Sequence, residues 1–318
     1  MRTMLATLVA LSTASAAWAQ DHALTPTDVL EFGQVSGTVR LALAEGSGDF
    51  TQGAAIDLDV DLNQYLTILE AAVGLGQGFE VELSIPYAFK QTSEGKGTFG
   101  VTNVKFEEED EGFGDLTAQG VYRLVKERKE TPQWVLALII TAPTGNDKHG
   151  EAEVTAPPPI GNTDGEKGGI GDGVWRYGFG SAVSKDLGGV EPYLGLSYVF
   201  GGNRTRNGVH EERADVGTIL VGGEFHISPN ATIDLRGTVT FESEDITEDN
   251  RAEKKEEAYT SLGAQGSLYV GIAPHVTLIL GAGVSKPEDH EVDTAAGLSL
   301  EGLFIYYLQI GLHIKLGL

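Results

Sequence analysis

The stretch ATIDLRGTVTF at residues 231–241 decides the fold. Its odd-numbered residues are Ala, Ile, Leu, Gly, Val and Phe, whereas its even-numbered residues are Thr, Asp or Arg. Successive side chains of a β-strand point to opposite faces, so this stretch predicts a strand with one apolar and one polar face. The same alternation runs through residues 79–89, 276–284 and 304–318.

Alternation along the rest of the chain predicts twelve strands. They cover about residues 34–44, 64–74, 78–89, 113–125, 132–142, 173–185, 190–201, 214–226, 230–241, 258–270, 275–284 and 303–317. Pro86 falls inside the third of these strands, and proline has no N–H to donate to a ladder. We therefore expect a local loss of pairing at Pro86.

The connections between these strands alternate between short and long. Five are tight turns near residues 74–78, 126–131, 186–189, 226–230 and 271–274, and six are predicted to be long loops at about 45–63, 90–112, 143–172, 202–213, 242–257 and 285–302. Bacterial outer-membrane barrels have short periplasmic turns and longer outside loops. The layout therefore predicts both termini on the periplasmic side.

A soluble sandwich also alternates, but it would carry charges across its outer faces. In this chain the acidic residues concentrate in the long connections, and the strands are long enough for a tilted membrane crossing. In hydrocarbon every backbone polar group must be paired, so the first and last strands must meet. The predicted fold is all-β, an antiparallel transmembrane β-barrel of about 12 strands.

Composition excludes several classes of protein. The 318 residues include 46 acidic and 22 basic side chains, for a net charge of −24, which argues against a nucleic-acid partner. The absence of cysteine excludes disulfide scaffolds and thiolate metal sites. No long apolar run follows the first 20 residues, so membrane-spanning helices are not expected.

The N-terminus has the order of a secretory signal. Arg2 precedes an apolar stretch, and Ala17-Trp18-Ala19 fits a cleavage site. We therefore predict a signal peptide at 1–19, a short periplasmic or plug segment at 20–33, and a barrel at 34–318. Together these predict a location in the bacterial outer membrane.

Alternation also assigns charged side chains to the barrel interior. Many of them lie near the short-turn ends of their strands, so they should form a polar belt at the periplasmic mouth. This belt is interpreted either as a structural ion-pair network or as a constriction that selects solutes. Its members are Glu80, Glu82, Arg123, Glu191, Glu224, Asp234, Arg236 and Lys315, with His226 and His313 nearby.

Catalysis is the second class of function to consider. Some outer-membrane barrels are hydrolases, which need a nucleophile, a histidine and a carboxylate in mutual reach. The candidates His149, His210 and His290 are scattered over different connections, and no Gly-x-Ser-x-Gly elbow occurs. We therefore predict no enzyme, no catalytic residue and no cofactor.

Two acidic clusters are candidate cation sites. The run 107–111 and the alternating Asp57, Asp59 and Asp61 offer oxygen ligands, but their spacing does not match a calcium loop. Charge runs are usually solvated, so no specific metal site is predicted. A diffuse cation bridge to lipopolysaccharide phosphates remains open.

Several segments resemble the outer-membrane proteins of the MetA-pathway of phenol degradation family. They are Leu83–Tyr87, Gly112–Leu116, Trp134–Gly145, Gly171–Gly173 and Pro192–Tyr198, in that order, and the likeness runs from about residue 34 to the C-terminus. The chain ends in Leu318, where many outer-membrane barrels end in an aromatic residue.

The resemblance implies a membrane barrel that takes up aromatic or other small hydrophobic solutes. Transport would be passive, because the sequence contains no energy-coupling segment. The expected partners are outer-membrane lipid and lipopolysaccharide, the barrel-assembly machinery and a small hydrophobic solute. The alternatives are a closed structural or surface-interaction barrel and, less favoured, an outer-membrane hydrolase.

Overall fold

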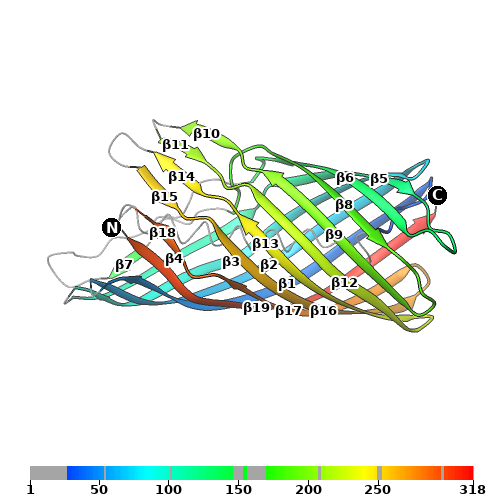
Figure 1. Cartoon of the computed structure of the whole chain (residues 1–318). Coiled ribbons are helices and arrows are strands. Elements are labelled where there is room, and N and C mark those ends of the chain that lie inside the picture. The colour runs from blue at the N-terminus through cyan, green and yellow to red at the C-terminus, as the bar shows by residue number, and fades with distance from the viewer. Residues whose placement is uncertain are drawn as a thin grey trace.

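The computed structural model describes residues 27–53, 55–100, 102–145, 153–155, 170–206, 209–248, 253–294 and 297–317. The predicted signal peptide lies outside the described residues. The strands are β1 (Gln34–Gln52), β2 (Ile56–Gly76), β3 (Phe79–Phe99), β4 (Thr102–Phe113), β5 (Leu116–Val125), β6 (Gln133–Ala142), β7 (Glu153–Thr155), β8 (Arg176–Ser184), β9 (Val190–Phe200), β10 (Asn203–Arg206), β11 (Val209–Glu212), β12 (Val216–Ser228), β13 (Ala231–Glu242), β14 (Asp245–Glu248), β15 (Glu253–Glu256), β16 (Tyr259–Ala273), β17 (Val276–Pro287), β18 (His290–Asp293) and β19 (Leu298–Gly317) (Figure 1).

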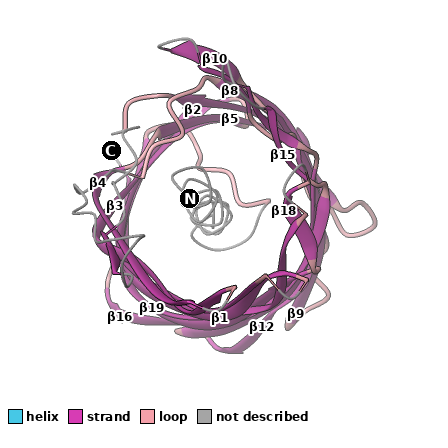
Figure 2. Cartoon of the chain, turned by 90° about the vertical axis from the view of Figure 1, so that its left-hand side faces the viewer, coloured by secondary structure: helices cyan, strands magenta, loops and turns pink. Residues whose placement is uncertain are grey.

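The long strands form a closed antiparallel barrel (Figure 2). Pairing between β1 and β19 closes it, with Gln34 opposite Gly317 and Leu43 opposite Leu308. β4 and β5 lie end to end against β3 and together count as one wall strand. The predicted barrel of 12 strands is therefore confirmed.

Short turns join the strands at one end of the barrel, which we call the turn end. The turn after β2 has positive φ angles at Gly76, Gln77 and Gly78, and the turn after β16 has one at His275. Glycine adopts this left-handed conformation without strain. All five predicted short turns lie at this end. The pairing of Gln34 with Gly317 is at the same end.

The opposite end, called the extended end, differs from the predicted set of long loops. β1, β2 and β3 continue well beyond residues 44, 63 and 89, so the predicted loops 45–63 and 90–112 are largely β-hairpins. β10, β11, β14 and β15 form a separate four-stranded sheet at this end (Figure 1). The predicted loops are wrong because charged residues do not end these strands, and the alternation continues through them.

Alternation persists in β2, but its polarity inverts at the extended end. Near the middle of the strand the outward Leu69 is exposed, and the inward Glu70 is buried. Further along, the outward Asp59 is exposed, and the inward Leu58 and Val60 are buried. Inward apolar side chains here form a core, whose buried members are Phe50, Ile56, Leu58, Val60, Phe106, Val292, Leu298, Leu300 and Leu303.

This inversion has a physical cause. Within the bilayer an outward side chain contacts lipid and must be apolar, whereas beyond the bilayer it contacts water. The extended strands can therefore place acids outward and bury an apolar core inside. The pairing of β1 with β2 continues across this boundary without interruption.

Pro86 interrupts the ladder as predicted. β5 pairs with β3 as far as Ser84, and β4 resumes pairing at Tyr87. Between them, the N–H of Gly114 donates to the carbonyl oxygen of Pro86 at 2.9 Å. The break between β4 and β5 therefore lies beside the proline.

The outer wall between the two ends is apolar. Leu235 and Leu308 both point outward and are 51% and 55% exposed. Aromatic side chains such as Trp175, Tyr177 and Tyr306 are also exposed, as in the girdles of membrane barrels. No helix of the described chain is long and apolar enough to span a bilayer. The closed wall with its apolar exterior places the chain in the outer membrane.

Candidate functional site in the barrel lumen

A cavity of about 330 Å³ lies inside the barrel. Its lining includes an apolar wall, mostly on the neighbouring strands β5, β6 and β8, and polar side chains from strands around the barrel. The apolar wall consists of Leu66, Val121, Val135, Ala137, Ile139, Ala182 and Leu220. The polar lining includes Gln64, Thr117, Gln119, Thr141, Ser197, Thr218, Arg236, Thr238, Thr240, Ser261 and Gln265.

The alternation predicts a polar lumenal face throughout, so it does not predict this apolar wall. β6 contains the signal, because both of its faces are apolar. Leu136 and Leu138 point to lipid and are exposed, whereas Val135 and Ile139 are only 2% and 3% exposed. A strand that is apolar on both faces must bury its second face against something other than lipid.

The segment Thr27–Gly33 packs against the same apolar wall at the turn end. Val29 forms a buried cluster with Val121, Val135 and Ala182, which all line the cavity. The backbone of this segment thus enters the lumen rather than running along the outside.

Polar contacts fix this segment in place. Arg123 donates to the carbonyl oxygen of Val29 at 2.6 Å and pairs with Glu31 at 2.9 Å. The N–H of Leu30 donates to Glu80 at 2.5 Å. The hydroxyls of Thr27 and Ser184 lie 2.7 Å apart. Two members of the predicted belt, Glu80 and Arg123, therefore hold the N-terminal segment.

The glycines of β2 make room for the segment. A Cβ on Gly74 would lie 2.1 Å from the carbonyl oxygen of Glu31 and 2.7 Å from that of Leu30. Such contacts are impossible for any other residue without displacing the chain. The absence of a side chain at Gly74 thus leaves the space that the backbone of residues 30 and 31 occupies.

A second group of belt residues surrounds Asp234, whose side chain is fully buried. Tyr193 donates its hydroxyl to Asp234 at 2.6 Å, and Arg236 Nε donates to the other carboxylate oxygen at 2.8 Å. A separate buried ion pair joins Arg40 and Glu70. Since the described contacts pair these charges, this part of the lumen is lined by fixed dipoles.

The remaining belt residues occupy separate positions at the turn end. Glu191 lies opposite Glu224 across β9 and β12. Glu82 lies opposite Ala72 in β2. Lys315 lies opposite Ser36 in β1. The structure thus distributes the predicted belt into several local groups around the wall.

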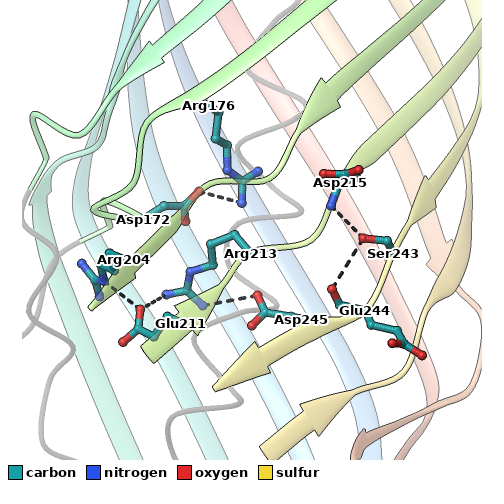
Figure 3. A network of polar contacts seen from close by, with 9 residues as sticks. All are labelled: Asp172, Arg176, Arg204, Glu211, Arg213, Asp215, Ser243, Glu244 and Asp245. Atoms are coloured by element: carbon teal, nitrogen blue, oxygen red, sulfur yellow. Dashed lines mark hydrogen bonds and ion pairs between the residues drawn. The ribbon is translucent and has the colours of Figure 1, made fainter. Parts of the chain in front are cut away.

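Arginines gather at the extended end of the cavity (Figure 3). Arg176 pairs with Asp172 at 3.1 Å, and Arg213 pairs with Asp245 at 3.4 Å and with Glu211 at 3.3 Å. Burial raises the pKa of the Asp245 carboxyl, and the positive charge of Arg213 opposes that shift. Of these residues, only Arg176 lies within a strand predicted from the sequence. The others lie on segments that were predicted to be loops.

The two described catalytic candidates, His210 and His290, have separate contacts. His149 lies outside the described residues. His210 contacts Thr205 and Glu212 on the β10–β11 hairpin, at 2.9 and 3.2 Å. His290 stacks on Tyr259 elsewhere at the extended end.

Comparison with solved structures identifies the fold. An outer-membrane channel from Pseudomonas putida F1 is 13% identical, with a TM-score of 0.60 over 93% of this chain and 100% of that chain. The transport unit of the autotransporter AIDA-I from Escherichia coli is 9% identical, with a TM-score of 0.59 over 99% of each chain. No curated protein matches the chain.

Comparison with protein families gives one match. Residues 42–162 match the family described as "Putative MetA-pathway of phenol degradation". The matched stretch contains the first three resembling segments, and the segments at 171–173 and 192–198 lie beyond it. The chain is therefore a bacterial outer-membrane β-barrel in which the resemblance to the MetA-pathway of phenol degradation family is confirmed over residues 42–162.

Proposed function

We propose that the protein is an outer-membrane channel for the passive uptake of small hydrophobic or aromatic solutes. The observation that carries this proposal is the cavity, whose lining combines an apolar wall, mostly on β5, β6 and β8, with many polar side chains. A phenol-like solute has an apolar ring and a hydrogen-bonding group, so it matches both the apolar and the polar part of this lining. The turn end, where β1 begins and β19 ends, would face the periplasm.

Two comparisons support this proposal. The family that matches residues 42–162 is described by a pathway of phenol degradation, and phenol is a small aromatic solute. The similar structure from Pseudomonas putida F1 is named as an outer-membrane channel. A channel that supplies such a pathway would bind its solute weakly, because strong binding slows release.

The belt residues have two roles in this proposal. Asp234 and Arg236 provide fixed charges beside the cavity and select against ions of the wrong sign. Glu80 and Arg123 hold the N-terminal segment, which narrows the turn end. The other belt residues add charge to the lumen near the same end; they are Glu82, Glu191, Glu224 and Lys315.

The expected partners lie outside the lumen. Acids that point outward at the extended end, such as Asp57 and Asp59, would contact lipopolysaccharide through bridging cations. Assembly of the barrel would use the barrel-assembly machinery.

A closed structural barrel is the second candidate. The packing of Val29 into the apolar wall favours it, because the segment fills the turn end of the cavity. The two candidates predict different behaviour of the purified protein. A channel conducts in a planar bilayer, whereas a closed barrel does not.

Uptake into proteoliposomes tests the proposal. The wild-type barrel should admit phenol faster than a hydrophilic solute of similar size, such as glycerol. Ile139→Asn should lower phenol entry several-fold and change glycerol entry little, because it places an amide in the apolar wall. Thr277→Asn is the matched control, since Thr277 faces the lumen opposite His313 and does not line the cavity.

Two results would reject the channel for hydrophobic solutes. One is absence of conductance together with uptake equal to that of empty liposomes. The other is equal loss of phenol and glycerol entry in Ile139→Asn, which would indicate a general pore without an apolar site.

A further inference from the structure

Three potential metal ligands meet at the turn end. Glu191 of β9 lies directly opposite Glu224 of β12, and His226 follows Glu224 by two positions on the same face. One ligand atom from each of these side chains lies within 4.8 Å of the other two. Two ligand atoms of a tetrahedral zinc ion with bonds of about 2.0 Å lie about 3.3 Å apart, so side-chain rotations that bring the three atoms closer together would close the site.

The pairing of the two glutamates is unfavourable in itself. Like charges directly opposite each other on a sheet destabilise the pair. Asp28 of the N-terminal segment adds a third carboxylate, whose charge acts on both Glu191 and Glu224. Among the ion pairs of the described residues, none joins a lysine or arginine to Glu191 or Glu224.

Glu224 supplies an independent indication of a ligand. Its side chain is 6% exposed, and its Oε1 atom is buried without a hydrogen-bond partner in the described structure. A buried carboxylate oxygen without a partner is unfavourable, because nothing replaces the hydrogen bonds that it made to water. Its neighbours Glu191 and His226 offer a carboxylate and an imidazole, and together with a cation they would satisfy it.

Surrounding hydrogen bonds orient the other two ligands. Ser184 donates its hydroxyl to Glu191 Oε1 at 2.7 Å. His226 Nδ1 lies 3.2 Å from the Thr232 hydroxyl, a contact that leaves Nε2 as the ring nitrogen able to bind a metal. Partners of this kind fix ring orientation at metal sites. The Ser184 hydroxyl also contacts Thr27, which connects the cluster to the N-terminal segment.

We propose that Glu191, Glu224 and His226 form a site for a divalent transition metal of the zinc type at the turn end. The charge of Asp28, which acts on both glutamates, would also be offset by the cation. The imidazole favours zinc over calcium and magnesium, which prefer oxygen ligands alone. The cation neutralises the opposed carboxylates and ties β9 and β12 to the N-terminal segment.

Titration calorimetry of the tag-free, detergent-solubilised barrel with zinc chloride tests the proposal. The wild type should bind one Zn²⁺ per chain, and neither Ca²⁺ nor Mg²⁺ should compete at equal concentration. Glu224→Gln and His226→Ala should each weaken binding by at least tenfold. Thr232→Val should weaken it about tenfold by freeing the imidazole ring.

His275→Ala is the matched control, because His275 is an exposed histidine in another turn at the same end. It should bind zinc like the wild type. Heat-modified migration on gels would show that each variant is folded. The proposal is overturned by an absence of saturable zinc binding in the folded wild type. It is equally overturned if binding in Glu224→Gln and His226→Ala matches the wild type.

Discussion

Arg123 donates a 2.6 Å hydrogen bond to the carbonyl oxygen of Val29, although 94 positions separate the two residues in the chain. This bond fixes the N-terminal segment where Val29 meets the apolar wall of the cavity. Arg123 was predicted to be a lumenal charge at the turn end, and its partner was not predicted. The bond connects the turn end of the barrel to the cavity proposed for the solute.

Gly74→Ala should open the turn end. The new Cβ would collide with the carbonyl oxygens of Glu31 and Leu30, so the N-terminal segment must move away from β2. We expect single-channel conductance to rise at least twofold. Gly271→Ala is the control, because its Cβ would meet the nearest atom, the carbonyl oxygen of Asn230, at an ordinary 3.7 Å. Equal conductance of Gly74→Ala and wild type would show that the segment does not limit flow.

Leu308→Arg should destabilise the barrel by about 2–4 kcal/mol, because it places a cation in the middle of the lipid-facing wall. Unfolding by guanidinium in lipid vesicles measures this free energy. Gln309→Asn, which changes the adjacent lumenal residue, should alter stability much less. Similar losses for both variants would contradict the assignment of the two faces.

Tyr193→Phe should cost about 1.5–3 kcal/mol, because it removes a hydrogen bond to the buried carboxylate of Asp234. The same unfolding assay applies. Tyr122→Phe serves as the control, since Tyr122 is 43% exposed on the outer wall. A loss of less than 0.5 kcal/mol, roughly the scatter of surface substitutions, would show that Arg236 alone satisfies Asp234.

The β3–β4 hairpin should loosen as pH rises. Burial, with a smaller effect of Asp110, raises the pKa of Glu108 to about 8. The folded hairpin therefore favours the protonated carboxyl, and its stability falls between the ordinary value of 4.5 and about pH 8. Limited proteolysis should cut the wild type faster at pH 8.5 than at about pH 5, after correction for protease activity.

Glu108→Gln should remove this pH dependence and protect the hairpin at high pH. Glu107→Gln is its control, because Glu107 is 40% exposed and pairs with Lys105. The assignment to Glu108 fails if both variants retain the pH dependence of the wild type.

The sequence by itself determined the barrel. The two-residue period of stretches such as 231–241 is a local property, and closure follows because lipid cannot hydrate an open edge. It also determined the outward direction of Leu235 and Leu308, and the break at Pro86. Each of these follows from neighbouring residues and from the solvent that one face must meet.

Only the tertiary structure decided what the lumenal face contacts. The sequence places Glu191 and Glu224 on inward faces, but their position opposite each other depends on the register between β9 and β12. The contact of Val29 with the apolar wall depends on the path of a segment that has no period of its own. Local pattern specifies a face, whereas register and through-space packing specify the partner. For the same reason, the charged stretch 56–62 has the local pattern of a loop, and only the packing of its inward side chains into one core makes it part of a strand.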